Sequence, residues 1–118
     1  MSVTTLAYVA AGGALGALAR YGIGVALSGF GLHGAAGILL VNVLGCAAMG
    51  ALVTRFPEAE SGQRVFLGAG VLGGFTTFSA FAADAVVLGS RWGTAYLLGS
   101  VLLSLMAFHL GKLAAGFP

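Results

Sequence analysis

The chain has 118 residues, of which 59% are hydrophobic and only 7% are charged, and its mean hydropathy is +1.06. So few charged side chains cannot cover a soluble globule of this size, which excludes a soluble domain and predicts an integral membrane protein. The net charge of +2 rests on five scattered basic residues, which excludes a nucleic-acid-binding surface.

Four apolar segments follow one another, each near the roughly 20 residues that a helix needs to cross a bilayer. They cover about residues 4–27, 34–54, 65–88 and 93–115. The first segment has neither a basic leading region nor a small-residue cleavage site, so we expect a retained span rather than a signal peptide. Short connections, including a tight turn over residues 89–92, predict antiparallel neighbours. The sequence therefore predicts an all-α, multi-pass protein of the cell (plasma or inner) membrane with a single four-helix transmembrane domain.

The basic residues are divided almost evenly between the two sides of such a bundle. Arg55, Arg64 and Lys112 lie on the side of the termini, and Arg91 lies on the other side with Arg20, if that side chain snorkels outward. This bias is too small to fix one orientation in the membrane. We therefore expect a dual-topology, antiparallel homodimer with its two-fold axis in the membrane plane.

Glycine is abundant, with 21 residues, and its spacing on the first three spans predicts close packing of helix backbones. The third span contains the stretch Gly73-Gly74-Phe75-Thr76-Thr77-Phe78-Ser79-Ala80-Phe81. Paired glycines lower helix propensity, and neighbouring hydroxyls offer the backbone other hydrogen-bond partners. The stretch therefore predicts a helix broken in mid-membrane. Carbonyls freed there are tolerated only if they are buried in protein, bind an ion or line a watery cavity.

The phenylalanines beside this break, Phe78 and Phe81, have two possible roles. Packing is the ordinary role of a phenylalanine in a bilayer. The positive edge of each ring can also contact an anion without a formal charge, and both rings flank the predicted break.

Polar residues on the other spans predict a lined path. Asn42, in the middle of the second span, either forms a hydrogen bond between helices or uses its N–H groups to replace water around a small anion. Tyr96, Ser100 and Ser104 recur every four residues and form one polar stripe on the fourth span. Serines in membrane helices commonly bond the carbonyl four residues earlier, but three hydroxyls in register favour a path, which Ser79 extends.

Two charged residues lie within the apolar segments. We expect Arg20 to snorkel to the interface, to draw anions to a pore mouth, or to fix the break in the third span. Asp84 is expected at a vestibule, in a hydrogen-bonded pair, or with Arg20, because a carboxylate repels anions in a narrow pore.

The remaining reactive side chains predict no catalysis. Cys46 is the single cysteine and is expected to be a small buried residue. His33 and His109 have no second ligand at zinc spacing. Since the sequence also contains no nucleophile and base set, phosphate loop or cofactor fingerprint, we expect no enzyme.

Taken together, these motifs resemble those of the small fluoride channels called Fluc or CrcB. The resemblance runs along essentially the whole chain: GGALGALARY on the first span, the segment around Asn42, GGFTTFS on the third span and the hydroxyl stripe on the fourth. GGFTTFS is the most specific of these. The resemblance implies an antiparallel homodimer of four-helix subunits with two pores. It also implies passive, fluoride-selective export that relieves fluoride toxicity.

The resemblance also implies roles for particular residues. Gly73 and Thr76 would offer backbone carbonyls to a structural Na⁺ ion at the dimer interface. The fluoride path would be lined by Asn42, Phe78, Ser79, Phe81, Tyr96, Ser100 and Ser104, with Arg20 as the first-span arginine. The sequence departs from the family pattern at Ala80, where threonine is usual, and at Asp84, where glutamate is usual. Because some family members are heterodimers, the Ala80 change leaves open that this chain is one subunit of such a channel.

Two other functions share part of this pattern. A small dual-topology, proton-coupled multidrug exporter has the same length and weak charge bias, but it needs a membrane carboxylate, for which Asp84 is the only candidate. A non-conducting membrane protein explains the glycines but not the clustering of Asn42, the break and the aligned hydroxyls. Substituting Asp84 and Asn42 separately distinguishes these functions.

Overall fold

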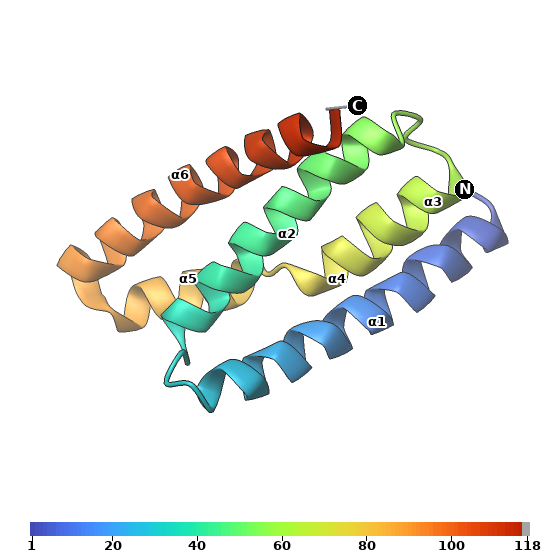
Figure 1. Ribbon diagram of the computed structural model, residues 1–118. Helices are drawn as coiled ribbons and strands as arrows, with labels where there is room; N and C mark the ends of the chain where they lie inside the picture. The colour runs from blue at the N-terminus through green and yellow to red at the C-terminus, as the bar shows by residue number, and fades with distance from the viewer. Residues whose placement is uncertain (117–118) are drawn as a thin grey trace.

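The computed structural model describes residues 1–116, which form helices joined by short connections (Figure 1). In chain order the helices are α1 (Val3–Ser28), α2 (Ala35–Arg55), α3 (Gly62–Arg64), η1 (Val65–Leu72), α4 (Gly73–Phe75), α5 (Phe78–Val87) and α6 (Gly89–Gly116). Four stretches are long and apolar enough to cross a membrane: Val3–Ser28, Ala35–Arg55, Gly62–Val87 and Gly89–Gly116. An all-helical chain with four candidate spans is thereby confirmed.

The helix ends differ from the expected ones at two connections. The tight turn expected over residues 89–92 is limited to Leu88 and Gly89, and α6 starts at Gly89. Gly89 has a φ of 81°, a left-handed conformation that glycine adopts at no steric cost, so one residue suffices to reverse the chain. The third stretch starts earlier than expected, at Gly62, because the Ser61 side chain caps it by accepting the Arg64 N–H.

Arg64 also closes the end of α2. Its Nη1 donates a hydrogen bond of 2.8 Å to the carbonyl of Phe56, the residue that follows α2. A cation at this position satisfies a carbonyl that the helix end leaves free and complements the helix dipole. The connection between α2 and α3 is therefore held close to the bundle.

The third stretch changes its packing partner along its length (Figure 1). Before Thr76 it packs against α1 through η1 and α4, whereas after Thr77 it continues as α5 against α6. Helix α2 packs along α6 and also contacts the third stretch on both sides of the threonines. Thr76 and Thr77 thus lie where the chain passes from one pair of helices to the other.

Glycines allow close contact between α1 and η1, and between α2 and α6. A Cβ atom on Gly16 of α1 would collide with the carbonyl of Val71, and one on Gly50 of α2 would collide with the carbonyl of Phe108 on α6. Only hydrogen fits between such backbones, which is the packing role expected of these residues.

One feature of the third stretch was not expected from the sequence: η1 is a π-helix of eight residues. Its bonds span five residues instead of four, and the N–H of Gly73 accordingly reaches the carbonyl of Gly68. Gly68 and Gly70, both in η1, are buried. A π-helix is wider than an α-helix, and η1 packs against neighbouring helices through these glycines.

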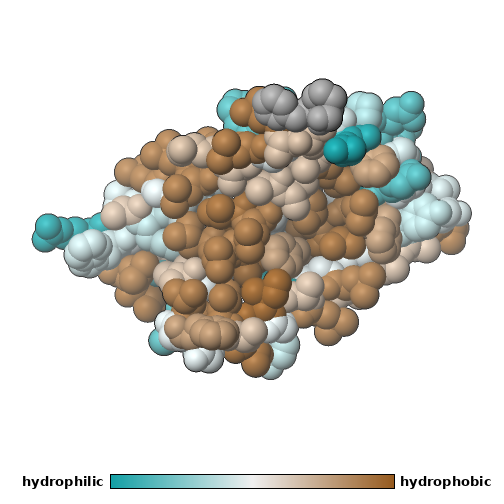
Figure 2. Space-filling model, viewed as in Figure 1, coloured by the Kyte–Doolittle hydropathy of each residue, from teal (hydrophilic) through white to brown (hydrophobic). Residues whose placement is uncertain are grey.

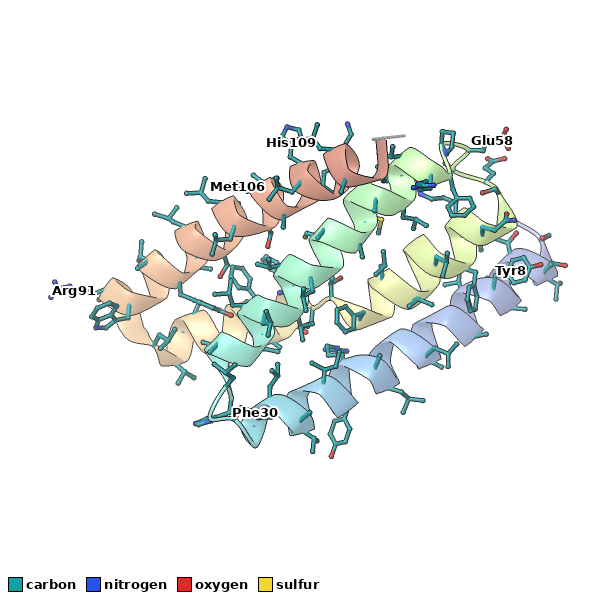
Figure 3. The ribbon with its side chains drawn as sticks, in the orientation of Figure 1. Tyr8, Phe30, Glu58, Arg91, Met106 and His109 are labelled. Carbon is teal, nitrogen blue, oxygen red and sulfur yellow. The ribbon has the colours of Figure 1, made fainter. Side chains whose placement is uncertain are left out.

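The outer surface is apolar along its middle and polar at its ends. Leu98, Leu102 and Met106 of α6 are 63%, 62% and 60% exposed. In Figure 2, hydrophobic residues cover the centre of the visible face and hydrophilic residues gather at both ends. Figure 3 places Glu58 at one end and Arg91 at the other. This distribution fits a bundle whose middle lies in lipid.

Helix packing through Gly16 leads to a stability prediction. We expect Gly16→Ala to lower the free energy of unfolding by roughly 1–3 kcal/mol, because its methyl group must push α1 away from the Val71 carbonyl. Gly13→Ala on the same helix is the matched control, since a Cβ there meets nothing within 4 Å. Thermal unfolding in detergent should give a lower Tm for Gly16→Ala alone. Equal Tm values for the two variants would contradict this account of the packing.

Candidate functional site

The third stretch is interrupted at two threonines. Helix α4 ends at Phe75, Thr76 and Thr77 have extended backbones (φ −80° and ψ 159°, φ −150° and ψ 123°), and α5 starts at Phe78. Two causes were predicted for the break, the paired glycines and the neighbouring hydroxyls. The glycines are themselves helical, whereas the hydroxyls bond the backbone as expected: Thr76 Oγ1 donates to the Leu72 carbonyl at 3.0 Å, and Thr77 Oγ1 accepts the Ala80 N–H at 3.3 Å. The two threonines thus cap the two helix ends that they separate.

Asn42 of α2 holds this interruption in place. Its Nδ2 donates to the Thr77 carbonyl and its Oδ1 accepts the Thr77 N–H, both at 2.9 Å. In a continuous α-helix the Thr77 N–H would bond to the Gly73 carbonyl. Asn42 therefore replaces that bond with a contact between helices. The interhelical role considered for Asn42 is confirmed, and its contact with an anion stays a prediction.

The carbonyls before the interruption fit a hard cation. A helix end leaves its last carbonyls without partners in the helix and carries a partial negative charge. The Gly73 carbonyl is one of them, because the Thr77 N–H bonds Asn42 instead, and Gly73 is exposed on the surface of the single chain. Thr76 lies in the interruption itself, so its carbonyl also lies outside the helix. Within residues 1–116, no three His, Cys, Asp or Glu side chains gather as a metal site. Sodium at this position stays a prediction, with backbone oxygens as its ligands.

A cavity of about 370 Å³ lies between α2, α5 and α6 beside the interruption. It brings together five of the residues predicted for the path, namely Asn42, Phe78, Phe81, Ser100 and Ser104. The other residues that line it are Cys46, Thr76, Thr77, Val101, Leu105 and Phe108. A carboxamide and hydroxyls therefore face the same space as two aromatic rings.

Tyr96 and Ser79, two other residues predicted for the path, do not line this cavity. The Tyr96 ring lies behind Phe81, with 5.3 Å between ring centroids, and its hydroxyl is buried without a hydrogen-bond partner. Ser79 is exposed on α5, and its hydroxyl lies 3.2 Å from that of Thr77. The four-residue spacing places Tyr96 on the same face of α6 as the two serines. In the structure, however, its ring packs against Phe81 of α5, and Tyr96 does not line the cavity.

The two phenylalanines differ in burial. Phe81 is 6% exposed, whereas Phe78 is 78% exposed, and their ring centroids are 5.6 Å apart at an interplanar angle of 57°. The two rings are therefore tilted against each other and are neither stacked face to face nor perpendicular. Phe78 therefore belongs both to the cavity and to the surface of the single chain.

Ser100 lines the cavity and has a buried hydroxyl. The residue is 5% exposed, and its Oγ makes no hydrogen bond of ideal geometry within the described residues. Ser28 and Thr54 do bond the carbonyl four residues earlier, at 3.0 and 3.1 Å, so Ser100 differs from them. The Tyr96 hydroxyl, one turn earlier on α6, is also buried and lies close enough to interact with the Ser100 hydroxyl, so these two groups are candidates to satisfy each other.

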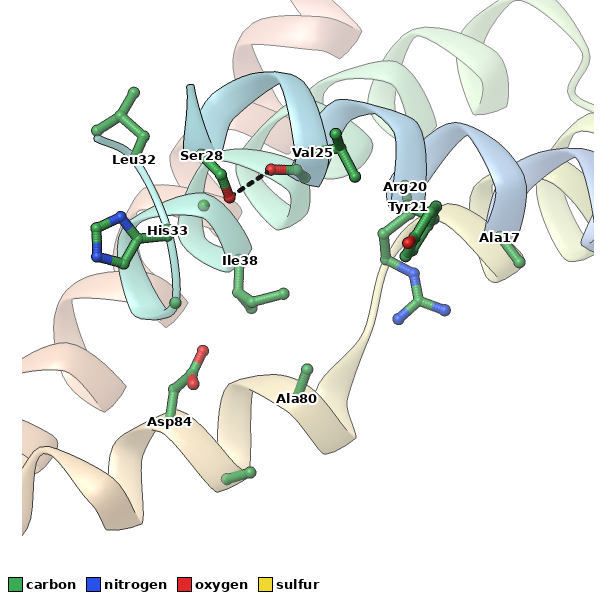
Figure 4. Close-up of a pocket in the computed structure, with 14 residues that line it drawn as sticks. Ala17, Arg20, Tyr21, Val25, Ser28, Leu32, His33, Ile38, Ala80 and Asp84 are labelled. Atoms are coloured by element: carbon green, nitrogen blue, oxygen red, sulfur yellow. Dashed lines mark hydrogen bonds between the residues drawn. The ribbon is translucent and has the colours of Figure 1, made fainter. Parts of the chain in front are cut away.

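A second cavity, of about 780 Å³, lies between α1, α2 and α5. Arg20, His33, Ala80 and Asp84 line it, and Figure 4 shows Arg20 and Asp84 well apart along it. Arg20 Nε and Asp84 Oδ2 are both buried without a hydrogen-bond partner in the described chain. Both charges thus face one cavity. Ala80 lines this second cavity and not the one that Asn42 lines. The hydroxyl that a threonine would carry at position 80 is therefore not lost from the cavity beside Asn42.

Cys46 and Phe108 are two lining residues that we did not expect from the sequence. Cys46 was expected to be a small buried residue, but it is half-buried and lines the cavity with Asn42. The signal was present, because Cys46 follows Asn42 by one helical turn, and Phe108 follows Ser104 by the same interval.

Comparisons with known proteins agree with this architecture. The family model described as "CrcB-like protein, Camphor Resistance (CrcB)" matches residues 7–112. A protein of Thermobifida fusca (strain YX), named fluoride-specific ion channel FluC 2, is 48% identical over 98% of this chain and 84% of its own length.

Two further relatives carry the name fluoride-specific ion channel FluC. The protein of Paracoccus denitrificans (strain Pd 1222) is 47% identical over 91% of this chain and 90% of its own length. The protein of Ruegeria sp. (strain TM1040) is 48% identical over 94% of both chains. These relatives are named as channels, which agrees with the expectation that the chain is not an enzyme. The match to the family model and these long alignments establish that the chain is a multi-pass membrane protein that belongs to the CrcB family of fluoride-specific ion channels.

Proposed function

We propose that the chain forms a passive, fluoride-selective channel that exports fluoride from the cytoplasm and so relieves fluoride toxicity. The observation that carries this proposal is the cavity beside the interruption. There Asn42 and the buried Ser100 line the same space as Phe78 and Phe81. The relatives' printed names support fluoride as the ion.

The chemistry of the cavity suits fluoride. Fluoride is small and strongly hydrated, so a selective path must replace its water with hydrogen-bond donors and still release the ion. Amide N–H, hydroxyl O–H and ring edges offer such contacts without a formal positive charge. Tyr96 and Ser79 extend the path from positions beside the cavity. A neutral lining holds the anion weakly enough for conduction.

The conducting unit is an antiparallel homodimer whose third span is broken in mid-membrane. Gly73 and Phe78 are exposed on the single chain at the interruption. Free carbonyls facing lipid are costly, so a second copy covering this surface would remove the cost. The nearly even division of basic residues favours opposite orientations. Each copy then contributes one cavity, which gives two pores for each dimer.

A structural Na⁺ ion lies where the two interrupted spans meet. The carbonyls of Gly73 and Thr76 would hold it, two from each copy, because hard cations prefer oxygen ligands. When bound, the ion supplies positive charge that offsets the negative ends of two α4 helices. Arg20 and Asp84 line the separate cavity between α1, α2 and α5, which would form the mouth of the path, and there the Arg20 guanidinium would attract anions.

One prediction of the proposed function concerns the two hydrogen bonds between Asn42 and Thr77. We expect Asn42→Ala to slow fluoride release from liposomes by at least roughly ten-fold, because it removes the two hydrogen bonds that fix the wall of the cavity and a donor that a narrow path would offer the anion. A fluoride electrode measures the initial rate, with chloride release recorded in parallel. Wild-type protein should release fluoride without chloride.

Leu44→Ala is the matched control for this experiment, since Leu44 is 49% exposed on the same helix and lies outside the cavity. Its rate should equal that of the wild type. Equal slowing by both substitutions would contradict the role of Asn42. No release from well-folded wild-type dimers would point to a missing partner subunit.

The second prediction concerns sodium. Protein prepared with N-methylglucamine in place of Na⁺ should release fluoride at least several-fold more slowly, because the carbonyls at the interruption then lack their cation. Returning Na⁺ to the mixture should restore the rate, and atomic emission should measure one bound Na⁺ for each dimer. Full activity in protein shown to be free of sodium would contradict this site.

The third prediction concerns orientation. In a Cys46→Ser background, Glu58→Cys and Ser90→Cys place a single thiol at opposite ends of the bundle, since Ser90 precedes Arg91 (Figure 3), and neither substitution removes a basic residue. Because both orientations are populated, a membrane-impermeant maleimide added to sealed cells should label about half of each variant. Permeabilisation should label the rest. Full labelling of one variant and none of the other would contradict dual topology.

A further inference from the structure

We propose that the Cys46 thiol lines the ion path on the side of Asn42 nearer the chain termini, and that an adduct on this thiol blocks the path. The inference rests on the proposed function, since it assumes that the cavity beside the interruption conducts. It adds a position and a direction: the path continues between α2 and α6 past Cys46 and Ser104.

Helix geometry extends both walls of the cavity in the same direction. Cys46 follows Asn42 by four residues on α2, and Ser104 follows Ser100 by four residues on α6, so each pair shares a face. Helices α2 and α6 lie side by side and run the same way, toward the end of the bundle where both termini lie (Figure 1). All four residues line the one cavity. The thiol therefore lies one turn closer to that end than the carboxamide.

Polar groups lie in both walls of the cavity near Cys46. Ser100 lines the same cavity and is 5% exposed, and the Tyr96 hydroxyl one turn earlier lies close enough to interact with its hydroxyl. Asn42 gives Thr77 a hydrogen bond through Nδ2, and a carboxamide has a second N–H on that atom. Most of the surface that lines the cavity is apolar, so these few donors are where a passing anion would find hydrogen bonds.

The Cys46 side chain is suited to this position. It is half-buried, so it is open to the cavity and still held by the bundle. A thiol is small and polarisable, and its S–H is a weak hydrogen-bond donor, so it can face a passing anion without trapping it. A larger group attached to its sulfur would occupy the space between α2 and α6 through which the anion passes.

The experiment uses the single cysteine of the chain. The thiolate attacks the sulfenyl sulfur of a methanethiosulfonate, which forms a mixed disulfide and releases methanesulfinate, while the thiol proton passes to the buffer. Solubilised dimers are treated with the ethyltrimethylammonium reagent before reconstitution, and intact-mass spectrometry measures the extent of labelling. We expect labelled protein to release fluoride at least roughly ten-fold more slowly, because the adduct narrows a path that must fit an ion closely. Dithiothreitol, which removes the adduct, should restore the rate.

Two variants separate blocking from general damage. Cys46→Ser should not respond to the reagent, when its treated rate is compared with its own untreated rate. Cys46→Ser with Ala48→Cys moves the thiol two residues along α2 to an exposed position outside the cavity. Residues two apart point to different sides of a helix, so labelling at position 48 should leave the rate unchanged.

The outcomes are distinguishable. Complete labelling of Cys46 without a change in fluoride release would overturn the inference and leave the proposed function intact. Failure of Cys46 to react while the thiol at position 48 reacts would also overturn it, because the thiol would then be packed away from water. Absence of fluoride release from untreated wild-type dimers would overturn the proposed function itself.

Discussion

The pair of hydrogen bonds between Asn42 and Thr77 is the interaction on which the rest of the site depends. Two extended residues inside an apolar span leave an N–H and several carbonyls without helical partners, and in lipid each such group costs several kcal/mol. Asn42 satisfies both polar groups of Thr77 at once, at 2.9 Å each. With that pair in place, α4 and α5 can point to different partners, and the cavity between α2, α5 and α6 has a fixed wall.

Glycine packing and the threonine interruption have complementary effects on the bundle. Glycines bring the backbones of α1 and the third stretch, and of α2 and α6, as close as carbonyl and Cα atoms allow. No side chains remain in these contacts to adjust their separation, so the helix pairs are rigid. The interruption lies between the two rigid pairs and is where polar groups collect. The few polar groups of the cavity are thus surrounded by closely packed, apolar side chains.

Much of this architecture could be predicted from the sequence, because apolar length alone specifies four spans, and GGFTTFS marks where the third helix stops. The contact between Asn42 and Thr77 could not, since it joins residues 35 positions apart on different helices. Register correctly grouped Ser100 and Ser104 but also included Tyr96, which lies behind Phe81. Cys46 was expected to be buried because it lies in an apolar run, but it lines the cavity between α2 and α6, which only the packing of these two helices could reveal.

The change of packing partner at the interruption has a consequence for how the chain is made. Asn42 emerges from the ribosome 35 residues before Thr77, an interval of roughly 2 to 7 s at ordinary rates of synthesis. Over that interval the second span carries an unmatched carboxamide, and α6, the helix along which α2 finally packs, is synthesised last. The nascent chain must therefore hold two spans in the membrane before either meets its final neighbour. The free-energy cost of placing the Asn42 carboxamide in the membrane is therefore met when the second span inserts, before Thr77 is available to bond it.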